Sequence, residues 1–332
     1  MKLLKPLFIF CLVLFLPTLA IPKIVFISKR EGGNNIYVMD DDGSGLQRLT
    51  FTQPPQWDAG PVWSPDGKRI AFFRNISKIP TRQIPRLFII DQDGSNEQQI
   101  IDDWASNCSW APDGRHIAFG GDSNIYVVDI ITREIQQLTN NQDLGEWATA
   151  PAWSPNGKYI AYRHRKPPNG ATTICVMNAD GTRQHQLIPG DEWNRFPPRW
   201  SSDSKSVLYF EVHADPDLGF WKVSNNVVIQ GRVLRNRRIL KIPEKWRIHS
   251  VCWFDNDKQV LIAAREFDAV IHRQIDIYKY NLGNNQITNL TNDPKDDLAP
   301  NWISDNILSV SPEDKKGIQW GKVKSLLKTV DP

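Results

Sequence analysis

The sequence predicts an all-β fold, a six-bladed β-propeller made of four-stranded antiparallel blades. Three observations lead to this prediction: a tryptophan motif that occurs six times, a strand-turn-strand motif between its copies, and a spacing of 43 to 53 residues between the tryptophans. That period is typical of one propeller blade. The chain of 332 residues is long enough for one such domain.

The first motif is a pair of strands, A and B, joined by a tight turn. It occurs as PVWSPDGKRIAF (61–72), CSWAPDGRHIAF (108–119), PAWSPNGKYIAY (151–162) and PRWSSDSKSVLYF (198–210), and more weakly as VCWFDNDKQVLIA (251–263) and PNWISDNILSV (300–310). In the first copy Pro65 sets φ at the first corner of the turn and Gly67 takes its left-handed exit. The six anchor tryptophans are Trp63, Trp110, Trp153, Trp200, Trp253 and Trp302. We expect each indole to fill the space between two blades.

The second motif supplies strands C and D. NIYVMDDDGSGLQRLT (35–50) is followed by related stretches at 86–100, 124–139, 173–187 and 276–291. Each stretch shows an alternating strand, a turn and a second strand, and Asp-Gly in several of the turns provides the positive φ of a tight hairpin. One unit therefore contains four short strands.

Together the motifs PxWSPDGKxIAF and IYVMDxDGSxxxxLT resemble the repeat of TolB-type β-propellers, and the resemblance covers nearly the whole mature chain. It implies a six-bladed propeller located in or beyond the periplasm, with functions that differ among family members.

The two ends of the chain are expected to share one blade. Residues 24–50 contain strands B, C and D without a preceding tryptophan strand, and the segment around Trp302 supplies a strand A. Pairing of the N- and C-terminal strands would close the ring and leave no free edge. Residues 307–310 resemble a strand B that would compete with residues 24–28, and the tail of about 312–332 is left unassigned.

The N-terminus has the pattern of an export signal. Residues 1–20 carry Lys2 and Lys5, then an apolar run, then Pro17 and small residues. This order is typical of a secretory signal peptide, and the apolar run is short for a membrane span; an uncleaved anchor is the alternative. We therefore expect residues 21–332 to form one monomeric propeller in the periplasm or outside the cell.

Charge argues against a nucleic-acid partner. The formal net charge is +3, and removal of the two lysines of the signal peptide leaves +1. The cysteines of the mature chain, Cys108, Cys175 and Cys252, are odd in number and far apart, so neither a disulfide framework nor a CxxC metal pair is predicted.

A second set of tryptophans recurs ahead of the anchors. The five collar tryptophans stand six or seven residues before an anchor and are Trp57, Trp104, Trp147, Trp193 and Trp246; the sixth unit has Asp296 and Asp297 at this place. Strand direction puts the A–B and C–D turns at one end of the propeller, the turn end, and the longer D–A and B–C loops at the other, the loop end. Binding usually occurs on such loops. The collar either packs its loops against neighbouring blades or binds a ligand or partner at the channel mouth.

Basic residues add to the loop end. The B–C loops carry Arg74, Lys78, Arg82, Arg86, Arg163, Arg165 and Lys166. These charges either are ordinary solvated loop residues or attract an acidic partner, with binding that weakens as salt rises.

No catalytic signature accompanies these features. The sequence lacks a GxSxG nucleophile elbow and Walker, HExxH and dinucleotide motifs, and no metal or other cofactor is predicted. The sequence therefore favours a noncatalytic protein-interaction or envelope-assembly module. The alternative is a lyase-like propeller enzyme that binds carbohydrate at a tryptophan-lined channel mouth.

Overall fold

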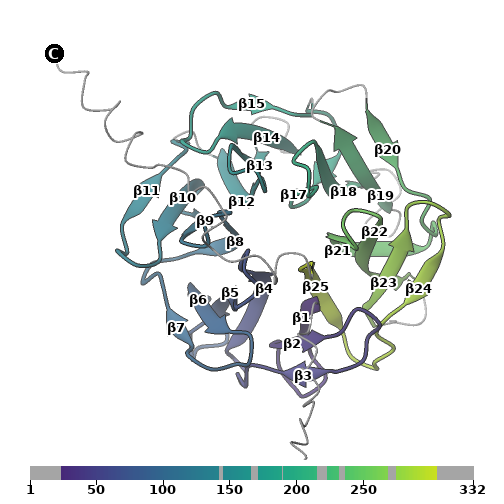
Figure 1. Cartoon of the computed structure of the whole chain (residues 1–332), viewed down its shortest axis with the longest axis horizontal. Coiled ribbons are helices and arrows are strands. Elements are labelled where there is room, and N and C mark those ends of the chain that lie inside the picture. Colours follow the sequence, from purple (N-terminus) through teal and green to yellow (C-terminus); the bar gives the residue numbers. More distant parts are fainter. Residues whose placement is uncertain are drawn as a thin grey trace, which may run out of the picture.

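The computed structural model describes residues 24–141, 145–165, 171–188, 190–214, 223–231, 236–267 and 274–304 (Figure 1). Every regular element in these ranges is a β-strand, and the strands form six antiparallel sheets around a common axis. The predicted six-bladed β-propeller is confirmed. The signal peptide predicted at 1–20 and the segments 307–310 and 312–332 lie outside the described residues.

We number the blades I to VI and give their strands from the centre outward (Figure 1). Blade I contains β25 (Asp297–Trp302), β1 (Ile24–Ser28), β2 (Asn35–Met39) and β3 (Gln47–Arg48). Blade II contains β4 (Trp57–Trp63), β5 (Arg69–Asn75), β6 (Pro85–Asp91) and β7 (Gln98–Gln99). Blade III contains β8 (Ser106–Trp110), β9 (His116–Gly121), β10 (Asn124–Asp129) and β11 (Ile135–Gln137).

The remaining blades follow the same order. Blade IV contains β12 (Trp147–Trp153), β13 (Tyr159–Arg165), β14 (Thr172–Asn178) and β15 (His185–Gln186). Blade V contains β16 (Asn194–Arg195) and β17 (Arg199–Trp200) on β18 (Ser206–Ala214), then β19 (Val223–Gly231) and β20 (Arg237–Ile239). Blade VI contains β21 (Trp246–Phe254), β22 (Gln259–Glu266), β23 (Asp276–Asn281) and β24 (Ile287–Asn289).

The innermost strand of blade V is broken in two. Pro197 and Pro198 stand between β16 and β17, and a proline has no N–H to give to a strand ladder. Phe196 lies at this break and still donates its N–H to the carbonyl of Phe210. The ring of Phe196 stacks on that of Phe210 at 4.2 Å and packs against the cluster between blades V and VI.

Blade I closes the ring as the sequence predicted. β25 pairs antiparallel with β1, with Trp302 opposite Ile24 and Asp297 opposite Ser28. The first and last described strands thus share one sheet, and pairing of N- and C-terminal strands is confirmed.

Two ion pairs hold this seam and explain why the sixth unit has no collar tryptophan. Lys29 Nζ lies 2.7 Å from Asp296, and Arg30 Nη2 lies 2.8 Å from the buried carboxylate of Asp297. The two acidic residues that replace the tryptophan therefore bind the basic residues that follow β1.

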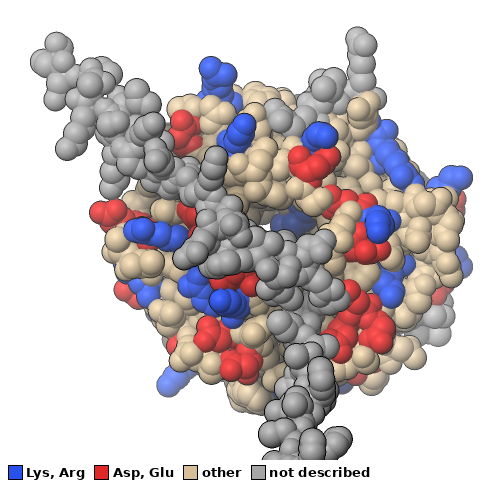
Figure 2. Space-filling model, viewed as in Figure 1, with Lys and Arg blue, Asp and Glu red and all other residues tan. Residues whose placement is uncertain are grey.

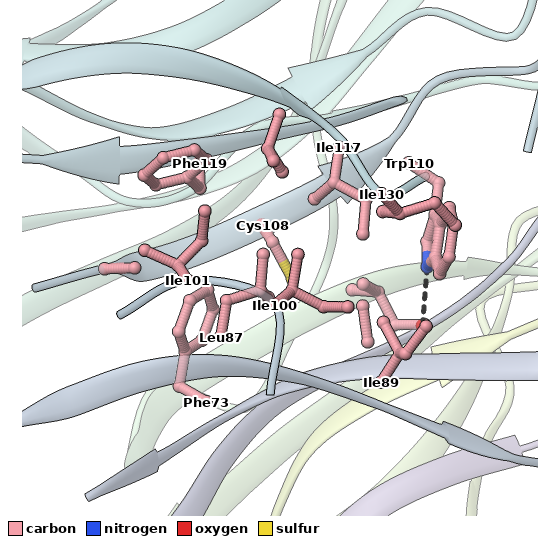
Figure 3. Packing of buried hydrophobic residues seen from close by; sticks show 14 residues of the cluster. Phe73, Leu87, Ile89, Ile100, Ile101, Cys108, Trp110, Ile117, Phe119 and Ile130 are labelled. Atoms are coloured by element: carbon pink, nitrogen blue, oxygen red, sulfur yellow. Dashed lines mark hydrogen bonds between the residues drawn. The ribbon is translucent and has the colours of Figure 1, made fainter. Parts of the chain in front are cut away.

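The hydrophobic core is divided among the gaps between blades. Six clusters of buried side chains occur in the described chain, one in each gap. Between blades II and III, Phe73 and Leu87 pack against Trp110, Ile117 and Phe119 (Figure 3). Burial of one indole of this kind contributes about 4 to 6 kcal/mol on an area basis. The anchor tryptophans do fill the space between blades, as expected.

Several anchors also hydrogen-bond to the preceding blade. The acceptor is the backbone carbonyl of the residue just before the preceding anchor (Figure 3). The three indole bonds of this kind are Trp110 to Val62 (3.3 Å), Trp200 to Ala152 (3.0 Å) and Trp253 to Arg199 (3.0 Å). These bonds satisfy the buried indole N–H and link the inner strands around the ring.

The Asp-Gly turns and Leu-Thr ends of the second motif meet between blades. A Cβ on Gly181, at φ +87°, would lie 2.9 Å from the carbonyl oxygen of Leu138 in the preceding blade. Gly43, at φ +90°, approaches Leu290 in the same way. Glycine is therefore required here both for its positive φ and for close contact.

Candidate functional site

A cavity of about 820 Å³ occupies the turn end of the central channel. All six anchor tryptophans contribute to its wall, together with residues of the A–B turns such as Pro65, Asp113 and Asn156. None of the collar tryptophans lines it. Figure 2 shows a hollow at the centre of the ring with basic side-chain atoms inside it. The sequence assigned the anchors to packing alone, whereas they also form the channel wall.

The collar tryptophans differ in their positions on the inner strands. Trp57, Trp147 and Trp246 are the first residues of β4, β12 and β21, so they belong to the strand ladders and not to the loops. Trp104 and Trp193 precede β8 and β16. The expectation that all five lie in D–A loops is thus wrong for three of them.

Register puts Trp246 on the opposite face of its blade from Trp57. Trp57 pairs with Asn75, and the anchor Trp63 pairs with Ile70, which lies five residues before Asn75 on β5. Trp246 pairs with Glu266, and the anchor Trp253 pairs with Val260, which lies six residues before Glu266 on β22. Successive side chains of a strand alternate between its two faces. A separation of five residues therefore puts Trp57 on the opposite face from its anchor, whereas a separation of six puts Trp246 on the same face as its anchor. Trp246 accordingly turns toward the preceding blade V.

Burial follows from this register. Trp246 is 7% exposed, belongs to the cluster between blades V and VI, and contacts Tyr278 with ring centres 4.4 Å apart and the rings tilted by 39°. Trp104 is 46% exposed. Trp57, Trp147 and Trp193 are half-buried. The collar thus contains one packing residue and four with surface available at the loop end.

Arg163, one of the predicted basic loop residues, contacts Trp147, one of the collar tryptophans. Its guanidinium carbon lies 5.0 Å from the ring centre of Trp147 and 4.8 Å from that of Phe196 in blade V. Its Nε is buried without an acceptor, and no carboxylate among the described residues forms an ion pair with it. Burial, together with the charge of Arg165, lowers the pKa of Arg163 to about 10. The side chain is still a cation at neutral pH, held against two rings without a counter-charge.

The other basic loop residues have different surroundings. Arg74 is neutralised, because its Nε lies 2.7 Å from the buried Asp58 and its Nη2 lies 3.0 Å from Glu97. Lys78 and Arg82 are exposed. Arg86 is half-buried and donates to the carbonyl of Pro85, and Arg165 is half-buried next to Arg163, while Lys166 lies outside the described residues.

Sequence reasoning missed a second pair of like charges at the loop end. Arg247 of β21 stands directly opposite Arg265 of β22. Burial, and then the charge of Arg265, lowers the pKa of Arg247. Their cross-strand position appears only when the register of blade VI is known, because both residues lie inside strands.

Histidines at this end bind acidic neighbours. His164 lies 3.0 Å from Glu146, and His213 lies 3.1 Å from Glu192. Among the described residues, no group of three or more His, Cys, Asp or Glu side chains is placed to hold a metal ion. Nor does the described part contain a helix with the length and hydropathy that crossing a bilayer requires.

Comparison with known proteins agrees with this architecture. The family model "TolB beta propeller domain" matches residues 74–216. A 74-residue segment is 42% identical to the Tol-Pal system protein TolB of Zymomonas mobilis and covers 22% of this chain and 15% of that protein. The structure of TolB from Acinetobacter baumannii superposes with a TM-score of 0.67 at 19% identity, over 85% of this chain and 66% of that one.

An enzyme shares the fold at greater distance. Oligogalacturonate lyase from Vibrio parahaemolyticus superposes with a TM-score of 0.53 at 13% identity, over 80% of this chain and 74% of the lyase. At this identity the likeness concerns the fold alone. The motifs, the family match and the superpositions agree: the chain folds as a six-bladed β-propeller, and its residues 74–216 are similar to the TolB propeller domain.

Proposed function

We propose that this propeller is an exported, noncatalytic interaction module that binds an acidic protein partner at its loop end. The observation that carries the proposal is the contact of Arg163 with Trp147 and Phe196. A guanidinium held against aromatic rings keeps its position at little entropic cost, and its terminal N–H groups suit a carboxylate.

Electrostatics supports an acidic partner. Arg163 lacks a carboxylate partner among the described residues, and burial and the charge of Arg165 lower its pKa. A carboxylate from a partner would offset both effects, which makes the pair more favourable than an ordinary surface ion pair. The exposed Trp104 and half-buried Trp147 and Trp193 would supply apolar contact area around it.

Other observations fit an envelope assembly. The N-terminal pattern of residues 1–20 supports export, and the curated relative carries the name of a Tol-Pal system protein. We infer that the propeller offers a rigid ring on which a partner docks, with no bond-making step.

The proposal is tested by crosslinking pull-down from the native envelope with the mature chain and two variants. Arg163→Gln removes the stacked cation, and Arg82→Gln removes an exposed loop cation as the matched control. We expect the variant at Arg163 to lose retention of an acidic partner by about tenfold and Arg82→Gln to retain it. Equal retention by both variants, or retention that does not fall with added salt, would contradict the proposal.

The enzyme alternative has its own test. A screen of polysaccharide substrates, with divalent metal added to the mature protein, is expected to give no turnover. Turnover that scales with enzyme concentration would overturn the noncatalytic assignment.

A further inference from the structure

Two arginines line the cavity at the turn end, Arg69 of β5 and Arg199 of β17, and only Arg199 belongs to an innermost strand. Arg199 of β17 directly precedes the anchor Trp200 and lines the cavity of about 820 Å³. Its Nη1 donates to the carbonyl of Pro198 at 3.0 Å, and its Nε is buried without an acceptor. No carboxylate among the described residues forms an ion pair with it.

The neighbouring side chains do not supply a counter-charge. The ionisable groups that act on Arg199 are the thiols of Cys108 and Cys252. Burial raises the pKa of Cys108 to about 12 and that of Cys252 to about 11, so both remain neutral thiols at neutral pH. The residues that precede the other five anchors are uncharged: Val62, Ser109, Ala152, Cys252 and Asn301. Among the six residues that directly precede an anchor, Arg199 is therefore the only charged one.

An unpaired cation inside a protein is costly, and an anion that binds beside it recovers much of that cost. Burial lowers the pKa of Arg199, which is the direction expected of a cation that lacks a partner. The side chain is nevertheless half-buried and not sealed, because it borders the cavity. The guanidinium is thus reachable from the channel.

The acidic groups of the cavity already have partners nearer the rim. In the A–B turns Asp66 accepts from Ser64, Asp113 contacts His116, and Asp257 accepts from Ser202, each at 2.6 Å. The remaining wall contains the prolines of the A–B turns and the accessible edges of the buried anchor tryptophans. A largely apolar wall with a cation that lacks a counter-charge is the usual character of a site for an organic anion.

We propose that the turn-end cavity binds an organic carboxylate with an apolar body, whose carboxylate contacts the guanidinium of Arg199. The aromatic or aliphatic body lies against the prolines of the A–B turns and the accessible edges of the anchor tryptophans. This site is at the opposite end of the channel from the partner surface around Arg163, and it involves none of the same residues. Failure of one proposal therefore leaves the other standing.

Calorimetric titration with two pairs of probes tests the site. 2-Naphthoate and 2-naphthamide differ in charge but share one body. Acetyl-Ala-Phe with a free C-terminus and its C-terminal amide form the second pair, which distinguishes a free aromatic acid from a chain end. In the mature protein we expect the carboxylate of at least one pair to bind about tenfold more tightly than its amide, which corresponds to about 1.4 kcal/mol.

Two variants locate the effect. Arg199→Met removes an unpaired cation, so it is expected to fold and to lose the preference for the carboxylate. Arg69→Met is the matched control, because Arg69 lines the same cavity but has no buried N–H without an acceptor and lies over the ring of Trp110 at 5.1 Å. This variant is expected to keep the preference for the carboxylate. Equal binding of acid and amide in both pairs, no binding of any probe, or a carboxylate preference that survives in Arg199→Met would overturn the proposal.

Discussion

Substitution of the collar tryptophans by alanine should separate packing from binding. Trp246 is buried in the cluster between blades V and VI, and its ring contacts that of Tyr278. Removal of a buried aromatic side chain costs about 3 to 5 kcal/mol. In a domain of this size, each kcal/mol of lost stability lowers the melting temperature by about 2 °C. The melting temperature of Trp246→Ala should therefore fall by roughly 6 to 10 °C.

Trp147→Ala should behave differently. Its half-buried ring contacts the guanidinium of Arg163, and such a contact is worth about 1 kcal/mol. The melting temperature should therefore fall by about 2 °C while retention of the acidic partner falls strongly. Trp57→Ala is the control, because Trp57 is also half-buried and starts an equivalent strand.

Differential scanning calorimetry of the three variants measures these shifts. Similar losses of stability in all three would refute the register argument, because it assigns Trp246 alone to the core. A stable Trp147→Ala variant that still retains the partner would remove Trp147 from the binding surface.

Three further predictions concern the blades and the channel. Gly181→Ala should destabilise the fold by about 1 to 2 kcal/mol more than Gly32→Ala in urea unfolding, because both have positive φ but only Gly181 meets a backbone carbonyl. Trp110→Phe should cost about 1 to 3 kcal/mol beyond the lost area, since the carbonyl of Val62 loses its donor. Desolvation and nearby Arg265 lower the pKa of His249 to about 4, but the side chain is exposed on β21, so solvent screening reduces the effect on stability. Stability should therefore fall slightly as the pH drops from about 6.5 to 4, and His249→Gln should show a smaller fall in urea midpoint.

The blade pattern is local and was therefore predictable. Anchor motifs, Asp-Gly turns and the missing strand A at the N-terminus each depend on residues close in sequence, and they led to six blades and to the closure between β1 and β25. The resemblance to TolB-type repeats pointed the same way, and the family match agrees with it.

The site was less predictable, because it depends on register and on contacts between blades. The spacing of seven residues before Trp253 was visible, but its consequence, a reversed Trp246, needs the pairing of β21 with β22. The contact of Arg163 with Phe196 forms across two blades at a proline break. The charge of Arg199 becomes unusual only when all six inner strands are seen around one cavity.

The seam in blade I also sets the order in which the molecule can be completed. Lys29 and Asp296 are 267 positions apart, so β1 emerges early during synthesis and its inner partner arrives last. The other five blades are built from consecutive strands and can form as the chain is delivered. Until β25 is available, β1 presents an open edge to any neighbouring chain. Pairing of β25 with β1 therefore covers the last open strand edge and ends the period in which that edge can aggregate with other chains.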